Sequence, residues 1–181
     1  MKPTHRRILV LLLLLAVTCC FAQTNDPAVT LKLLPAPKEV RLGEGTFVIT
    51  GETKIVSNSA HAADYRVSIE MLQQEIEQQT GSQLKAENVQ REPKTGAIVL
   101  GRLDDPSLRA ELESKGLKAD KDFSEQGYLI YVDKSRILVG GASGQGLFYG
   151  IQTLRQLLRR QDKQTVCPSV AIRDWPSMLT L

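Results

Sequence analysis

The strongest constraint on the fold comes from a strand–turn–strand–helix unit in the second half of the chain. Gly127–Val132 is rich in β-forming residues, Asp133–Ser135 turns the chain, and Arg136–Val139 returns as a second strand. The glycine-rich stretch Gly140–Gly146 ends that strand, and a helix is predicted from Ser143 to about Arg160. Its apolar stripe is Leu147, Ile151, Leu154 and Leu158. A hairpin followed at once by an amphipathic helix predicts a sheet with that helix packed on it.

The first half of the chain alternates between strand and helix patterns. Short strands are predicted at Glu39–Leu42 and Thr46–Thr50, joined as a hairpin by Gly43–Gly45, and a further strand at Lys54–Ser57. A helix follows, and Gly81 is placed to end it as a left-handed cap. The stripe of this helix is Tyr65, Ile69, Leu72 and Ile76.

Three further elements complete the predicted fold. Ala97–Leu100 is predicted to be a buried strand, and Val166–Ile172 a last extended segment. Asp104-Asp105-Pro106 starts a polar helix that runs to about Lys115, with acidic residues at its positive end. Because hairpins dominate, we expect an α+β domain with a mixed, largely hairpin-built sheet and helices packed on one face.

The N-terminus has the layout of a secretory signal peptide. Met1–Arg7 carries three basic residues and no acidic one, and Ile8–Val17 is an apolar run of ten residues. This run is too short for a transmembrane helix, which needs about 20 apolar residues. We predict cleavage after Ala22 and an exported protein, periplasmic or extracellular, with no transmembrane span. In the alternative, a lipoprotein signal with Cys19 as the lipidated residue, the protein would stay anchored.

The remaining chain is predicted to form one domain. Residues 23–30 are polar and are expected to form a flexible tether, and residues 31–178 form the α+β domain. Of the 23 basic residues, the three in the signal peptide leave with it, so 20 basic and 20 acidic residues balance. The only later basic pair, Arg159-Arg160, is expected at a helix C-terminus, where it complements the dipole. A nucleic-acid partner is therefore not expected.

The residue types of common catalytic and metal centres are scarce. His5 lies in the signal peptide, and His61 precedes the first long helix, where a solvated residue near the cap is the simpler interpretation. Cys167 is the one cysteine beyond residue 22 and is expected to be a small buried apolar residue. One histidine and one cysteine cannot supply a zinc site. We therefore predict no catalytic residue, no metal ligand and no cofactor-binding residue.

Two weaker patterns in the sequence have simple structural explanations. Gly140–Gly146 precedes a helix N-terminus, as phosphate-binding loops do, but it lacks the Gly-Lys-Ser/Thr ending and favours a tightly packed turn. Asp104 and Asp105 are explained by a helix start, and Glu70 and Glu77 by a solvated helix face. No carboxyl pair for glycoside cleavage can be named.

Three segments carry a resemblance to a known family. They are Leu34–Lys38, Gly127–Ile130 followed by the helix motif within Gly141–Leu154, and Ile172–Pro176. Together they resemble the domain that precedes the catalytic barrel in bacterial β-N-acetylhexosaminidases of glycoside hydrolase family 20. The match covers nearly all of residues 31–178.

The resemblance implies a zincin-like α+β fold, a name that refers to topology and requires no metal. It also implies that the catalytic centre is missing, because the family's sugar-binding arginine and Asp-Glu pair lie in the barrel. After Trp175–Met178 this sequence continues only through residues 179–181, a truncated tail where the barrel would begin. No catalytic residue of the family can be placed on this sequence.

The sequence thus predicts an accessory, non-catalytic N-terminal domain of a β-N-acetylhexosaminidase-like hydrolase, a fragment that is inactive alone. Its partner would be the missing barrel, docked on an apolar patch near the last helix and the C-terminus. The alternative is a stand-alone exported carbohydrate-binding or interaction module. That module would bind a glycan through the exposed sheet face or Trp175.

Overall fold

The computed structural model describes residues 31–57, 62–89, 91–120 and 123–175. The predicted signal peptide, Cys19, the tether, His61 and the tail 179–181 lie outside these residues. The elements are β1 (Glu39–Ile49), β2 (Lys54–Ser57), α3 (Ala62–Thr80), β3 (Ala86–Asn88), β4 (Ala97–Arg102), α4 (Pro106–Ser114), β5 (Tyr128–Val132), β6 (Arg136–Gly141), α5 (Gly144–Leu157), β7 (Arg159–Gln161) and β8 (Gln164–Asp174). No helix within the described ranges is long and apolar enough to cross a membrane.

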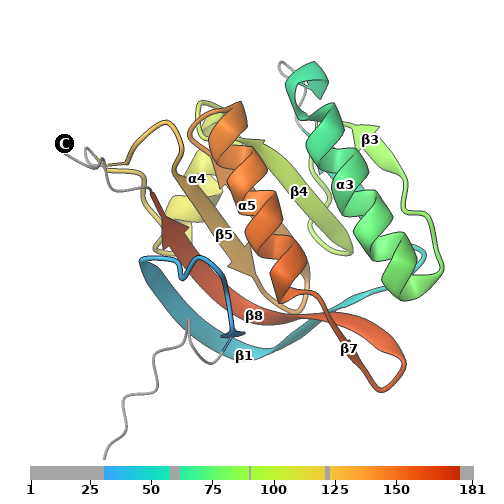
Figure 1. Ribbon diagram of the computed structural model, residues 1–181. Helices are drawn as coiled ribbons and strands as arrows, with labels where there is room; N and C mark the ends of the chain where they lie inside the picture. Colours follow the sequence, from blue (N-terminus) through green and yellow to red (C-terminus); the bar gives the residue numbers. More distant parts are fainter. Residues whose placement is uncertain (1–30, 58–61, 90, 121–122, 176–181) are drawn as a thin grey trace, which may run out of the picture.

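The strands form one mixed sheet in the order β1-β8-β5-β6-β4-β2-β3, with β7 paired to β8 (Figure 1). This confirms the α+β class. Pairing is antiparallel from β1 to β6 but parallel across β6, β4, β2 and β3, so hairpins build only part of the sheet. The parallel part arises because α3 and α4 interrupt the chain between strands, and parallel neighbours need such crossover connections.

Helices cover both faces of the sheet. The longer helices α3 and α5 lie side by side on one face, as expected, and bury Leu72, Ile151 and Leu154 in one core cluster. The short helix α4 packs on the opposite face through Leu108 and Leu112. The sequence predicts helices on one face only, and α4 differs from that prediction. The physical reason is that β4 is apolar on both faces, and a strand of this kind needs cover on both.

The predicted N-terminal hairpin is wrong. Residues 39–49 form a single strand, because both halves pair with β8 and the register shifts between Leu42 and Thr46. Gly45 has a left-handed φ of 88°, so the extra residues are absorbed as a bulge instead of a reversal of the chain.

The end of the last helix also differs from the prediction. Helix α5 stops at Leu157, and Arg159 and Arg160 belong to β7, which forms a tight hairpin with β8. Asp162 and Lys163 take the left-handed conformations at its tip, with φ of 49° and 66°. The short strand β3 was not predicted.

The predicted helix boundaries elsewhere are confirmed. Gly81 follows α3 with φ of 74°, and its N–H donates to the Glu77 carbonyl at 2.8 Å. Asp105 is the N-cap of α4, where its carboxylate accepts from the N–H groups of Ser107 and Leu108.

Candidate functional site

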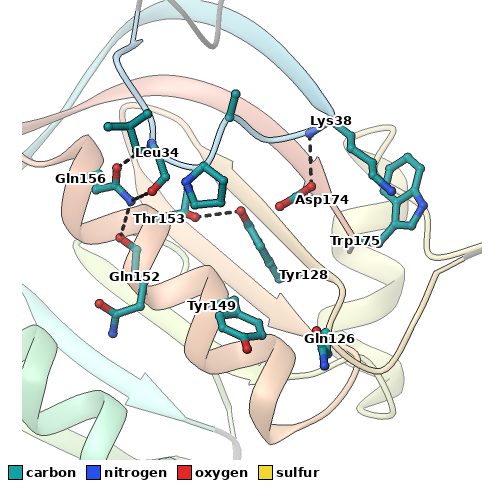
Figure 2. A pocket seen from close by; sticks show the side chains of 12 residues that line it. Leu34, Lys38, Gln126, Tyr128, Tyr149, Gln152, Thr153, Gln156, Asp174 and Trp175 are labelled. Atoms are coloured by element: carbon teal, nitrogen blue, oxygen red, sulfur yellow. Dashed lines mark hydrogen bonds between the residues drawn. The ribbon is translucent and has the colours of Figure 1, made fainter. Parts of the chain in front are cut away.

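A groove of about 410 Å³ lies where the N-terminal segment, β5, α5 and the end of β8 meet (Figure 2). It combines aromatic rings, amide side chains and exposed apolar groups. Its lining residues are Leu34, Pro35, Ala36, Lys38, Gln126, Tyr128, Tyr149, Gln152, Thr153, Gln156, Asp174 and Trp175.

Close packing of α5 on the sheet creates one side of the groove. A Cβ at Gly146 would lie 2.3 Å from the Gly127 carbonyl oxygen, and one at Gly150 would lie 3.2 Å from the Tyr128 Cβ. At Gly146 a side chain would overlap the backbone, so only glycine fits there, and at Gly150 the packing leaves little room for one. On α5, Tyr149, Gln152 and Gln156 recur at helical spacing beside the buried stripe and therefore line the groove together.

The floor of the groove is a buried hydroxyl pair. The Tyr128 hydroxyl and the Thr153 Oγ1 lie 2.8 Å apart, and this bond ties β5 to α5. Burial raises the pKa of Tyr128 above its ordinary value. Tyr128 therefore stays neutral at physiological pH and serves as a structural hydrogen-bonding group.

Tyr128→Phe is expected to lower the free energy of unfolding by about 1–2 kcal/mol, because Thr153 loses its buried partner. Urea unfolding followed by circular dichroism measures this. Tyr128→Phe combined with Thr153→Val should recover part of the loss, because the double variant leaves no hydroxyl unpaired. If Tyr128→Phe alone were as stable as the wild type, the hydrogen bond between Tyr128 and Thr153 would not contribute to stability.

The N-terminal segment is fastened across the top of the groove. The Gln156 side chain accepts from the Leu34 N–H at 2.9 Å and donates to the Leu34 carbonyl at 3.0 Å. Further along, the Lys38 N–H donates to Asp174 Oδ1 at 3.2 Å. The Leu34 side chain nevertheless stays 79% exposed and Tyr149 37% exposed. The groove is thus bridged by hydrogen bonds to the N-terminal segment and presents uncovered apolar surface.

The carboxylates of the groove do not form a hydrolytic pair. Asp174 is the one acidic side chain among its described lining residues, and its Oδ1 already accepts the Lys38 N–H. Glycoside cleavage generally uses two carboxyl groups on either side of the scissile bond.

The glycine-rich turn is a packing element. The Ser143 hydroxyl accepts from the N–H groups of Gln145 and Gly146 and donates to the Glu125 carbonyl, so it caps α5 itself. Cys167 is buried, and burial raises the pKa of its thiol to about 12, which disfavours the reactive thiolate. Across the described residues, no group of three or more histidine, cysteine or acidic side chains could hold a metal ion.

The acidic residues that the sequence analysis assigns to helix starts and solvated helix faces do not line the groove. Asp105 caps α4, and Asp104 pairs with Arg102 at 2.8 Å. Glu70 and Glu77 are exposed on α3. The groove residues of α5 were missed, because glutamines beside an apolar stripe look like an ordinary solvated helix face.

One carboxyl outside the groove has a shifted pKa. Burial raises the pKa of Glu92 above its ordinary value of 4.5; Asp105 adds to this, while Arg136 and Lys94 oppose it. The folded state therefore holds this proton more tightly than the unfolded chain. Its contribution to stability is complete below about pH 4.5 and is lost as the pH rises through the folded pKa.

Glu92→Gln is expected to remove the loss of stability that ionisation of Glu92 causes as the pH rises, because the amide cannot ionise. The stability of the variant should fall less than that of the wild type between about pH 4.5 and about pH 7. Thermal unfolding at the two pH values measures the difference. A variant with the same pH dependence as the wild type would show that Glu92 is not buried in the fold.

Comparison with known proteins places this geometry in a family. Residues 30–175 match the family described as glycosyl hydrolase family 20, domain 2. The chain is 25% identical over 154 residues to a β-hexosaminidase of Porphyromonas gingivalis, covering 81% of this chain and 17% of that protein. The chain thus spans less than one fifth of the length of this curated relative.

Solved structures show the same fold. The chitobiase of Flavobacterium johnsoniae superposes with a TM-score of 0.60 at 20% identity, over 81% of this chain and 21% of that one. The β-N-acetylhexosaminidase of Streptomyces coelicolor gives a TM-score of 0.58 at 26% identity, over 78% of this chain and 26% of that one. With the family match across residues 30–175, the chain belongs to the domain 2 family of glycosyl hydrolase family 20.

Proposed function

We propose that this chain acts as an exported, non-catalytic accessory domain of a β-N-acetylhexosaminidase-like glycoside hydrolase, whose chemistry resides in a separate catalytic barrel. The observation that carries this is the groove. Among its described lining residues there is one carboxylate, held by a backbone N–H, where hydrolysis would need two opposed carboxyl groups. Export is proposed from the signal-like N-terminus.

The groove also supports a docking role. Leu34 and Tyr149 are two of the large apolar side chains exposed on the described surface, and both line it. Tyr149 is a residue of the last helix, and Leu34 is bonded to Gln156 of that helix, near which the sequence predicts an apolar docking patch. Apolar surface of this kind is buried favourably against a second domain.

A hydrolysis assay tests the non-catalytic role. The purified chain is expected to release no chromophore from a chromogenic N-acetylglucosaminide above the uncatalysed background. The Porphyromonas gingivalis β-hexosaminidase serves as the positive control in the same assay. Robust turnover by the pure chain would overturn the proposal.

A carbohydrate-binding module is the second candidate, because aromatic rings and amides line the groove. The geometry at Trp175 weighs against it, since the Lys38 and Arg173 cations lie 4.3 and 4.1 Å from its ring centre, where a sugar would stack. Calorimetry with chitin oligomers separates the two. We expect no heat of binding; heat that disappears in Trp175→Ala would favour the module.

A further inference from the structure

Trp175 is the first residue beyond β8 and the single tryptophan of the sequence. It lies at one end of the groove, and its ring packs at a tilt against Phe123, with ring centres 6.4 Å apart. Residues near the end of a domain are commonly loosely held. Here the side chain is instead engaged from several directions.

The first of these contacts to the Trp175 ring comes from the Arg173 guanidinium, which is itself held by three hydrogen bonds. Nε donates to the Lys118 carbonyl at 2.8 Å, and the two terminal nitrogens bind Glu39 Oε1 and Asp120 Oδ1 at 2.5 Å each. The Arg173 side chain is only 11% exposed. Three bonds, two to the loop that holds Lys118 and Asp120 and one to Glu39 of β1, fix the guanidinium plane. Its Cζ lies 4.1 Å from the Trp175 ring centre.

Lys38 provides a second contact from the N-terminal segment. Its Nζ lies 4.3 Å from the Trp175 ring centre, while its N–H donates to Asp174, the preceding residue. Two cations can share one ring here because Glu39 and Asp120 balance the charge of Arg173. The indole is thus attracted from both the first and the last parts of the domain.

We propose that Arg173 and Lys38 hold the Trp175 ring as an orientation latch, which fixes the direction in which the polypeptide leaves β8 beside the groove. The purpose of the latch rests on the proposed function, since an accessory domain supports a catalytic unit only if the junction between them keeps one geometry. Arg173 is accordingly a positioning residue that acts through Trp175.

Because Trp175 is the only tryptophan, its fluorescence in the full chain reports the latch directly. The measurements are acrylamide quenching and time-resolved anisotropy of the wild type, Arg173→Met and Lys38→Met. Arg109→Met is the matched control, because it removes an exposed arginine paired with Glu113 on α4. Far-UV circular dichroism verifies that each variant is folded.

The wild-type ring is expected to be quenched far less than free N-acetyltryptophanamide and to show little motion independent of the domain. Each latch variant should raise the quenching constant by about two- to fivefold, the population change expected when one cation–π contact is lost. Arg109→Met should match the wild type. If Arg173→Met does not fold, the exposed Lys38 still tests the latch.

A wild-type ring as accessible as the free compound would overturn the latch, as would folded variants with unchanged quenching and anisotropy. The readout uses neither a sugar nor an enzyme activity. A failure of the latch is therefore distinguishable from a failure of the proposed function, which the hydrolysis assay tests.

Discussion

Gly141→Ala is expected to destabilise the protein by more than about 3 kcal/mol. A Cβ at this position would lie 2.1 Å from the Leu147 backbone nitrogen and 2.5 Å from its Cα. These are backbone atoms in the first turns of α5, so no flexible side chain can move aside. Far-UV circular dichroism and urea unfolding measure the loss.

Neither partner of this contact is free to shift. Gly141 pairs with Tyr128 on β5 and with Arg102 on β4, and its carbonyl accepts the Leu103 N–H at 2.8 Å. Gly51→Ala is the matched control, because its Cβ would meet only the Ser82 side chain, at 3.6 Å or more. The control should stay within about 0.5 kcal/mol of the wild type. Equal stability of the two variants would show that α5 does not pack on β6 as described.

The second large effect concerns the buried arginine at the start of β6. Arg136→Met is expected to cost about 3 kcal/mol, because it leaves the Glu111 carboxylate without its main partner in a poorly solvated site. The Arg136 side chain is 7% exposed and that of Glu111 15%. Arg136 also donates to the Pro93 carbonyl at 3.3 Å, so its loss loosens the segment before β4.

Chemical denaturation at neutral pH measures this loss. Arg136→Met combined with Glu111→Gln should recover much of it, because the second change removes the half-buried charge that is left with only the distant Lys94 Nζ, at 3.7 Å. Arg109→Met, which breaks an exposed pair with Glu113, should cost less than about 0.5 kcal/mol. If Arg136→Met were no less stable than this control, Arg136 and Glu111 would not form a buried ion pair that stabilises the fold.

The elements with local signals were predictable. The stripe of α5, the capping glycine after α3 and the N-cap of α4 each depend on residues a few positions apart, where helical periodicity and capping chemistry act. The hairpin of β5 and β6 follows the same logic, because Asp133–Ser135 supplies the turn. These segments alone were enough to predict the α+β class.

Errors arose where two local interpretations compete. Gly43–Gly45 suits a hairpin or a bulge equally well, and only pairing of both halves with β8 selects the bulge. Arg159 and Arg160 continue the helical pattern locally, yet β-pairing with Thr165 and Val166 takes them into β7. Tertiary pairing overrides local propensity in both cases.

The groove could not be predicted, because its parts are distant in sequence. Leu34 and Gln156 are 122 residues apart, and Lys38 and Asp174 are 136 apart. Trp175 illustrates the consequence. The sequence offers it as one of two possible glycan-binding surfaces of the alternative module, but the fold brings Lys38 and Arg173 against its ring.

By itself, the sequence determined the helices, most strands, the α+β class and the scarcity of catalytic side chains, because these depend on residue types and short spacings. Only the tertiary structure decided that α4 covers the second face, that residues 39–49 form one bulged strand, and that a groove opens beside Trp175. Such features depend on contacts between segments that are distant in the sequence. The geometry of these contacts is set when the whole sheet assembles, and no local pattern encodes it.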